Sequence, residues 1–241
     1  YCLNLLQAPP LYKFLKYTVL TDVQQRLLID RNSTKSGLTK VPLLNGGTLE
    51  RWKDSRLYQQ LLGIYGEGNV TLKKVSAEVK SAVQQYYELL DAKKYLDFTM
   101  IIAHAVAEIQ NNDALREKVS TQLKYLVVDE YQDVNPLQEM LIRQLHDLGA
   151  NLCVVGDDDQ TIYQWRGSDV SNIIEFANRY PKVKQVPLND NYRSSSGIVL
   201  AARQVIENNN PAPLPKKMES TDPQPHQRGD VLALAVNDPA Q

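Results

Sequence analysis

Two adjacent carboxylates, Asp129 and Glu130, directly follow a short apolar run at residues 125–128. That run is rich in β-branched residues, which is typical of a strand buried on both faces of a parallel sheet. Ligands of open α/β sheets bind beyond the carboxyl ends of the strands. At that edge one acid can hold Mg²⁺, and its neighbour can take a proton from an attacking water. A pair of solvated acids at a strand end is the plain alternative.

The residues after this pair favour the chemical interpretation. Asn135 is placed to cap a helix that begins at Pro136, and apolar residues recur at helical spacing as far as residue 148. A second buried-type strand is predicted at residues 151–155, and polar residues 156–160 follow it. Asp129 and Gln160 are therefore expected to lie near each other at the carboxyl edge of adjacent parallel strands. The pattern predicts a phosphate and metal site.

Composition indicates a soluble globular protein. Of the 241 residues, 43% are hydrophobic and 23% are charged. No run approaches the roughly 20 apolar residues that a membrane span needs, and residues 1–6 lack the features of a secretory signal. Cys2 and Cys153 are not expected to form a disulfide, which fits a reducing cytoplasm. The three histidines show no metal-ligand spacing.

Charge is unevenly distributed along the chain. Residues 1–95 carry 14 basic and 8 acidic side chains, a net charge of +6, whereas residues 96–241 carry 13 basic and 20 acidic ones, a net charge of −7. A basic half suggests a polyanionic partner, usually nucleic acid. A well-solvated surface is the alternative that charge alone leaves open.

Residues 1–95 are predicted to be mainly helical. A glycine-rich turn at residues 63–69 is not interpreted as a phosphate loop, because no Gly-Lys-Ser/Thr sequence follows it and no strand precedes it. Helices or amphipathic pieces are predicted at 3–6, 11–15, 22–29, 49–62, 75–90, 98–109, 113–119, 136–148, 169–177 and 197–206. Further strands are predicted at 183–186 and 230–236, and a loop at 208–225.

Three stretches together resemble the UvrD/Rep/PcrA family of superfamily-one DNA helicases. Residues 127–133 (VVDEYQD) match the family's Walker B motif, residues 155–167 (VGDDDQTIYQWRG) match motif III, and residues 188–194 (LNDNYRS) match motif IV. The resemblance implies an α/β fold: a partial RecA-like parallel-sheet motor domain with a mainly helical inserted domain. It also implies an ATP-dependent 3′-to-5′ DNA helicase, which couples ATP hydrolysis to translocation on single-stranded DNA and to duplex unwinding.

The resemblance also implies a division into three parts. Residues 1–95 would hold the helical domain 1B with the end of the preceding 1A segment. Residues 96–189 would be the RecA-like domain 1A, and residues 190–241 would be the start of domain 2A. The implied partners are single-stranded and duplex DNA, with repair or recombination proteins in addition and no membrane.

Five residues receive nucleotide-site roles from the resemblance, with ATP and Mg²⁺ as the implied cofactors. Asp129 would hold Mg²⁺ through water, and Glu130 would polarise the attacking water. Gln160 would sense the γ-phosphate. Arg193 would act as an arginine finger that stabilises charge in the transition state. Tyr192 would pack near the adenine, unless it belongs to the core.

Three more residues receive DNA-binding roles. Trp165 would stack on a base of single-stranded DNA, Arg166 would link the DNA to the nucleotide, and Tyr163 lies in the same motif. The alternative for Trp165 is a wedge that holds its loop in place, but an aromatic flanked by polar residues favours stacking.

The sequence departs from the family's pattern in one important respect. It contains no Gly-x-x-x-x-Gly-Lys-Ser/Thr loop and no Gly-Lys pair. The chain is therefore expected to be an internal fragment that does not hydrolyse ATP by itself. Three alternatives remain open at this point: a subunit of a helicase–nuclease, a non-catalytic helicase-like module that binds DNA or protein, and, more remotely, an unrelated Mg²⁺ phosphatase.

Overall fold

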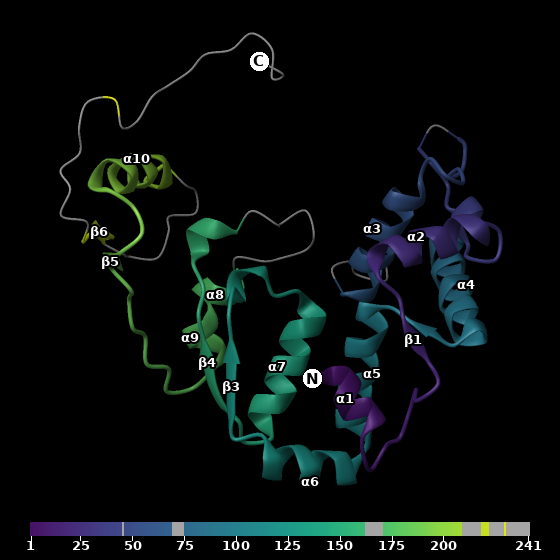
Figure 1. Ribbon diagram of the computed structural model, residues 1–241, viewed down its shortest axis with the longest axis horizontal. Coiled ribbons are helices and arrows are strands. Elements are labelled where there is room, and N and C mark those ends of the chain that lie inside the picture. The colour runs from purple at the N-terminus through teal and green to yellow at the C-terminus, as the bar shows by residue number, and fades with distance from the viewer. Residues whose placement is uncertain (45, 69–74, 162–170, 209–217, 222–228, 230–241) are drawn as a thin grey trace. The chain divides into compact units, whose positions relative to one another are not determined.

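The computed structural model describes the chain except for residues 45, 69–74, 162–170, 209–217, 222–228 and 230–241. The chain divides into two compact units, one of residues 1–156 and 161–170 and the other of residues 157–160 and 171–241. Both are mixed α/β, with helices and short parallel strand pairs (Figure 1). No helix in the described ranges is both long and apolar enough to cross a membrane.

The first unit contains the larger share of the described helices. In chain order its elements are α1 (Cys2–Gln7), β1 (Thr18–Val19), α2 (Asp22–Arg31), η1 (Leu38–Lys40), α3 (Ser55–Gly66), α4 (Ala77–Lys93), β2 (Tyr95–Leu96), α5 (Phe98–Asn111), α6 (Asp113–Gln122), β3 (Tyr125–Val128), η3 (Tyr131–Asp133), α7 (Pro136–Asp147) and β4 (Asn151–Val154).

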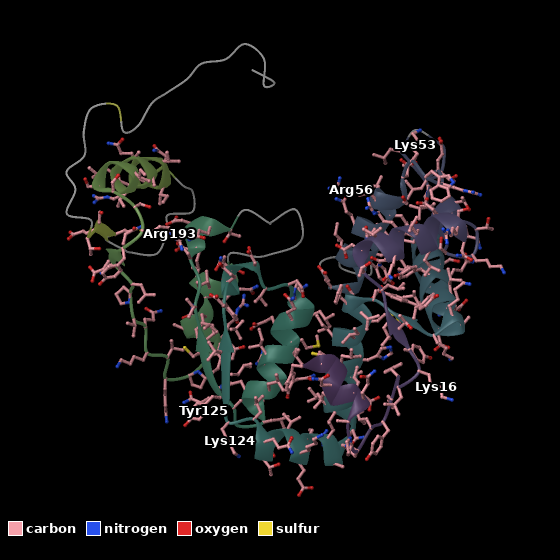
Figure 2. The ribbon with its side chains drawn as sticks, in the orientation of Figure 1. Lys16, Lys53, Arg56, Lys124, Tyr125 and Arg193 are labelled. Carbon is pink, nitrogen blue, oxygen red and sulfur yellow. The ribbon has the colours of Figure 1, made fainter. Side chains whose placement is uncertain are left out.

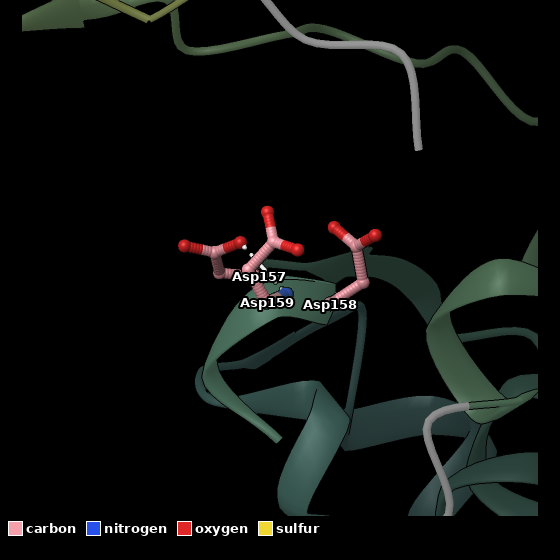
Figure 3. Close-up of side chains that lie close together, drawn as sticks. All are labelled: Asp157, Asp158 and Asp159. Carbon is pink, nitrogen blue, oxygen red and sulfur yellow. Dashed lines mark hydrogen bonds between the residues drawn. The ribbon is translucent and has the colours of Figure 1, made fainter. Parts of the chain in front are cut away.

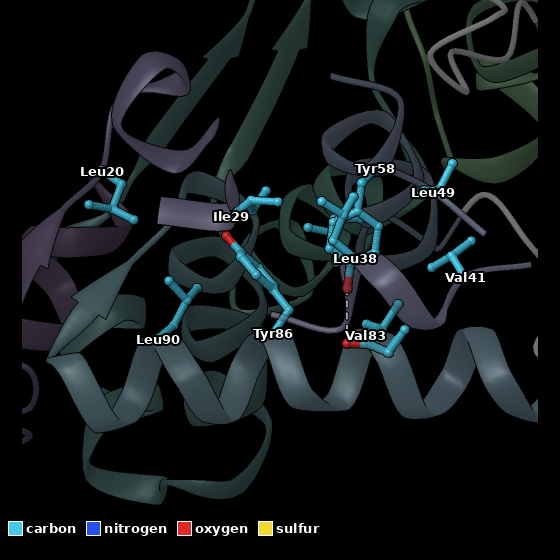
Figure 4. Close-up of a cluster of buried hydrophobic side chains, with 11 residues drawn as sticks. Leu20, Ile29, Leu38, Val41, Leu49, Tyr58, Val83, Tyr86 and Leu90 are labelled. Carbon is cyan, nitrogen blue, oxygen red and sulfur yellow. Dashed lines mark hydrogen bonds between the residues drawn. The ribbon is translucent and has the colours of Figure 1, made fainter. Parts of the chain in front are cut away.

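Helices α2, α3 and α4 enclose a hydrophobic cluster with Tyr58 and Tyr86 at its centre (Figure 4). Both rings are fully buried, so their hydroxyls need partners inside the fold. The Tyr58 hydroxyl donates to the carbonyl oxygens of Ser36 and Ala82, 2.6 and 2.9 Å away. The backbone of Gly37 can approach that of Ala82 closely because Gly37, at a φ of 80°, has no Cβ. A Cβ at this position would lie 2.3 Å from the Ala82 carbonyl oxygen.

A buried polar network joins α2 and α4 to the start of α5. Asp97 caps α5 by accepting from the Met100 N–H at 2.7 Å, as its position before the apolar run predicts. The Tyr86 hydroxyl donates to the other carboxylate oxygen at 2.8 Å and accepts from the Gln25 amide, also at 2.8 Å. Burial raises the pKa of Asp97, and its hydrogen bonds oppose that shift only in part.

Strands β3 and β4 pair in parallel, from Tyr125 opposite Asn151 to Val128 opposite Val154, with α7 as the helical return. This confirms the two predicted strands and the helix between them. The apolar side of the pair contributes Leu126 to a cluster with helices α1, α5, α6 and α7. Figure 1 shows α7 running alongside the two strands.

The prediction that β3 is buried on both faces is wrong for this chain. Tyr125 and Val127 remain 75% and 69% exposed (Figure 2 labels Tyr125). Only Leu126 and Val128 face the helical side, so burial alternates along the strand. A four-residue apolar run indicates a strand, but not how many of its faces are covered.

Several predicted N-terminal boundaries also need correction. Residues 11–15 are not helical, because Tyr12 and Phe14 adopt positive φ angles. The helix predicted at 49–62 begins at Ser55. Before it, Trp52 also has a positive φ and donates its N–H to buried Asp30 at 2.7 Å, which turns the chain. Strands β1 and β2 pair in parallel and were not predicted.

The second unit contains η4 (Asp158–Gln160), α8 (Ser171–Ile174), α9 (Phe176–Arg179), β5 (Asp190–Asn191), α10 (Ser196–Ile206) and β6 (Glu219–Ser220). Strands β5 and β6 pair in parallel. The strand predicted at 183–186 is absent, and β6 lies within the predicted loop at 208–225. Two-residue strands carry too little periodicity to be read from sequence. The strand predicted at 230–236 lies outside the described residues.

Candidate active site

The turn after β3 presents Asp129 and Glu130 at the carboxyl end of the strand. Both side chains are exposed. Glu130 adopts a left-handed backbone conformation, with φ 50° and ψ 44°, which is uncommon for a residue other than glycine. Its N–H donates to the Asp129 carboxylate at 2.9 Å. This strained geometry is the kind that surrounding structure must hold in place, and it is frequent at active sites.

Glu130 is fixed by the residues that follow it. The Gln132 side-chain amide donates to a Glu130 carboxylate oxygen at 2.6 Å, and Gln132 itself is only 1% exposed. The Asp133 N–H donates to the Glu130 carbonyl oxygen at 2.9 Å. One carboxylate oxygen is thus anchored to a buried amide while the side chain stays open to solvent, an arrangement that can orient a water molecule.

The turn is tied to β4 and to α7. The N–H of fully buried Tyr131 donates to the Val155 carbonyl oxygen, just beyond β4, at 3.0 Å. The Tyr131 hydroxyl donates to the Glu139 carboxylate on α7. These bonds extend the β3–β4 pairing into the turn, so the position of Glu130 depends on both strands.

The start of α7 closes the other end of the turn. Asn135 and Gln138 form a reciprocal capping box, and the helix begins at Pro136, as predicted. The Leu137 N–H, which no residue of the helix can satisfy, donates to the Glu67 carbonyl oxygen at 3.1 Å, beyond the end of α3. The helical part of the first unit therefore contacts the same turn.

Asp133 adds a third carboxyl group near Glu130. Burial of the carboxyl and, to a lesser degree, the charge of Glu130 raise the pKa of Asp133 above its ordinary value. One of its carboxylate oxygens is buried and has no hydrogen-bond partner in the described chain. The turn therefore concentrates negative charge, which suits a bound cation.

Three consecutive acids follow β4 in sequence. Asp157, Asp158 and Asp159 offer carboxylate oxygens within 4.8 Å of one another (Figure 3). Asp157 accepts from the Asp159 N–H at 3.2 Å, the dashed line in that figure, and from the Gln160 side-chain amide at 2.7 Å. Gln160 is exposed, and its hydrogen bond to Asp157 orients its side-chain amide.

Tyr192 and Arg193 follow β5 in the second unit. Tyr192 is 81% exposed, which excludes the interpretation that its ring belongs to the core. Its hydroxyl donates to Asp190 at 3.5 Å. The exposed Arg193 (Figure 2) is held through its backbone, whose N–H donates to Asn191 at 2.9 Å, and its guanidinium makes no ion pair with any described residue.

The structure thus brings Asp129 and Glu130 together in the first unit, and it places Gln160, Tyr192 and Arg193 in the second. Tyr163, Trp165 and Arg166 lie outside the described residues, so their DNA-binding roles stay predictions, as does the proximity of Asp129 and Gln160.

Sequence reasoning gave no role to Gln132 and Asp133. Both belong to the VVDEYQD stretch, but the signal that marks them is structural. Gln132 and one carboxyl oxygen of Asp133 are buried, and both residues lie beside the exposed Glu130.

The known proteins to which this chain is similar include DNA helicases. Residues 19–181 match the UvrD/REP helicase N-terminal domain family. The chain is 40% identical over 131 residues to the ATP-dependent DNA helicase PcrA of Bacillus subtilis, covering 54% of this chain and 18% of that protein. It is 34% identical over 198 residues to DNA helicase II of Rickettsia typhi, covering 80% of this chain and 30% of that protein.

The chain spans less than a third of the length of these relatives. The family match covers most of the chain and includes the turn at Asp129–Asp133 and the acids after β4. This chain therefore belongs to the UvrD/REP helicase family.

Proposed function

We propose that this chain is part of an ATP-dependent DNA helicase that couples ATP hydrolysis to 3′-to-5′ translocation on single-stranded DNA and to duplex unwinding. The observation that carries the proposal is the exposed Glu130 carboxylate, fixed by buried Gln132 beside Asp129 at the end of a parallel strand. The names of the relatives, which include ATP-dependent DNA helicases, support the same activity.

The proposed architecture is a RecA-like motor with a helical insertion. Residues 96–189 would form the motor domain 1A, and residues 190–241 the start of domain 2A. Residues 1–95 would form the helical domain 1B with the end of a preceding 1A segment. The parallel β3–β4 pair with its α7 return supports this assignment.

Asp129 fits a role in holding Mg²⁺, because it offers an exposed hard-oxygen donor and has one carboxylate oxygen engaged by a backbone N–H. When bound, Mg²⁺ neutralises charge on the phosphates. Glu130 would orient the attacking water and draw its proton toward the carboxylate. Gln160 would contact the γ-phosphate, and Arg193 would stabilise the charge that develops on it.

Single-stranded DNA would meet Trp165 by base stacking, with Arg166 and Tyr163 beside it. The net charge of +6 in residues 1–95 supports a second DNA contact in the helical part. Duplex DNA and repair or recombination proteins complete the proposed partners, and the cytoplasm is the proposed location. The intact bonding around Glu130 favours a catalytic protein over a non-catalytic module of the same family.

The test uses the complete open reading frame that encodes this chain. Purified protein is assayed for phosphate release with and without single-stranded DNA, and for unwinding of duplexes with a 3′ or a 5′ tail. DNA-stimulated ATPase and unwinding of the 3′-tailed duplex are expected. ATPase without unwinding of either duplex, or unwinding only from the 5′ tail, would contradict the proposal.

A further inference from the structure

Two adjoining hollows lie between α2 and α4 in the first unit. One, of about 640 Å³, is lined by the segment after α2 and by α4. The other, of about 350 Å³, is lined by α2, β1, β2 and the end of α4. They share Asn32 and Lys93, so they adjoin each other, and together they are named here the α2–α4 groove. Both helices are drawn in Figure 1.

The groove carries a concentrated positive charge. Arg31, Lys35, Lys40 and Lys93 line it, against a single acid, Glu88. All four cations are exposed, and none makes an ion pair with a described residue.

Some lysines outside the groove form ion pairs. Lys13, Lys53 and Lys94 pair with Glu108, Glu50 and Asp91. Lys16, Arg56 and Lys80, which also lie outside the groove, are exposed and make no ion pair with a described residue, so the groove is distinguished by the convergence of its cations rather than by their lack of partners.

The helix dipoles explain the positions of only two of the four cations in the groove. Arg31 and Lys93 end α2 and α4, where a cation is favoured by the helix dipole. Lys35 lies in the segment between α2 and η1, and Lys40 ends a single 3₁₀ turn. Neither has a helix dipole to offset, so their convergence on the groove calls for another reason, and an anionic ligand provides it.

The remaining lining favours nucleic acid over a small anion or an acidic peptide. Tyr95 lines the smaller hollow and is half-buried against the hydrophobic cluster of α2, α3 and α4, so part of its surface remains for contact with a base. Gln85 lines the larger hollow, and its side-chain oxygen is buried without a hydrogen-bond partner among the described residues. If the Gln85 side chain rotated toward the hollow, a base amino group would supply the missing donor.

We propose that the α2–α4 groove binds single-stranded DNA, with Lys35, Lys40 and Lys93 contacting successive phosphates and Tyr95 contacting a base. The proposal rests on the DNA-binding function proposed above and assigns one of its contacts to this groove. The phosphate contacts carry no sequence information, so binding is expected to be sequence-independent.

The test measures binding of a fluorescein-labelled oligodeoxythymidylate to the 241-residue chain by anisotropy over a range of salt concentrations. The groove variant is Lys35→Ala/Lys40→Ala/Lys93→Ala. The control variant, Lys16→Ala/Arg56→Ala/Lys80→Ala, removes the same charge from exposed cations of the same unit that do not line the groove and make no ion pair with a described residue (Figure 2 labels Lys16 and Arg56).

Wild-type protein should bind with an affinity that falls steeply with salt. Losing three phosphate contacts should flatten the log–log salt slope by about 2, since each contributes roughly 0.7 on single strands. At low salt the groove variant should bind at least about tenfold more weakly, and the control variant should change by less than about threefold. A Lys→Arg version of the three groove residues should retain binding, which separates lost charge from lost folding.

The outcomes distinguish the two proposals. Equal losses in the groove and control variants, with clear wild-type binding, would overturn the groove and leave the DNA-binding function standing. Absence of wild-type binding by this chain at low salt would overturn the groove, whereas the DNA-binding function itself is tested on the complete reading frame. Binding of labelled polyglutamate of matched charge as tight as that of DNA would overturn the assignment to nucleic acid.

Discussion

The side-chain amide of Gln132 donates a 2.6 Å hydrogen bond to the carboxylate of Glu130, so a fully buried residue orients an exposed acid. The bond joins residues two apart in a tight turn, in which Glu130 has a left-handed backbone. The proposed base is therefore held by its own motif rather than by a distant part of the chain.

Gln132→Ala should impair turnover more than nucleotide binding. A hydrogen bond to a charged group contributes about 1.5–3 kcal/mol, so kcat for DNA-stimulated ATP hydrolysis should fall about tenfold to hundredfold. KM for ATP should change by less than about threefold, because Gln132 is proposed to touch Glu130 and not the nucleotide. Steady-state kinetics on the complete reading frame provide the measurement, with Gln122→Ala on the surface of α6 as control. Equal losses in both variants, or a change in KM alone, would refute the positioning role.

Gly37→Ala should severely destabilise the hydrophobic cluster enclosed by α2, α3 and α4. The new Cβ would lie 2.3 Å from the Ala82 carbonyl oxygen, a backbone atom that cannot rotate away. A cost of about 3 kcal/mol or more is expected, because strain and overpacking act together. Gly46→Ala is the matched control: its φ of 87° is equally unfavourable, but nothing lies within 4 Å. It should cost about 1–2 kcal/mol, the strain of the left-handed backbone alone. Urea unfolding measures both, and equal costs would show that the close approach is unimportant.

Asp97 should make stability fall as pH rises. Burial raises its pKa in the folded chain, so the folded state holds the proton more tightly than the unfolded state does. Its contribution to stability is therefore full below the unfolded pKa of about 4 and is lost as pH rises through the higher folded pKa. Asp97→Asn keeps a side-chain oxygen for the α5 cap and removes the titration. The melting temperature of the wild type should fall relative to this variant between pH 4 and pH 7. A constant difference over that range would contradict the assignment.

Trp165→Ala should weaken single-stranded DNA binding by roughly 1–3 kcal/mol, the usual contribution of a base–aromatic stack. ATP hydrolysis without DNA should change little. Anisotropy titration and DNA-free turnover of the complete reading frame test the two statements separately. If the loss appeared in DNA-free turnover instead, Trp165 would have a structural role.

The sequence predicted those parts of the fold that depend on local signals. Asn135 before Pro136 and Asp97 before an apolar run located the starts of α7 and α5. The two apolar runs around α7 identified β3 and β4. Parts that depend on distant partners were missed. Thr18 pairs with Tyr95 across most of the helical region, and neither two-residue strand has a detectable period.

The candidate site was also predicted only where local sequence signals mark it. The acids Asp129 and Glu130 were found because their types and position after a strand suggest chemistry. Gln132 was not assigned a role, because its function depends on burial and on the left-handed turn at Glu130, and neither is visible in sequence. The α2–α4 groove likewise requires helices that are far apart in sequence to meet.

The role proposed for Glu130 is to orient the water that attacks ATP. Its most direct test is single-turnover hydrolysis of ATP by the complete reading frame, with saturating single-stranded DNA, in wild type and in Glu130→Gln. The variant keeps the size and the hydrogen-bonding capacity of the side chain but cannot accept a proton. Hydrolysis should slow by about a hundredfold or more, the usual range for loss of a general base, while ATP binding measured with a fluorescent analogue stays within about threefold. Hydrolysis at the wild-type rate in the variant would show that the reaction does not use Glu130.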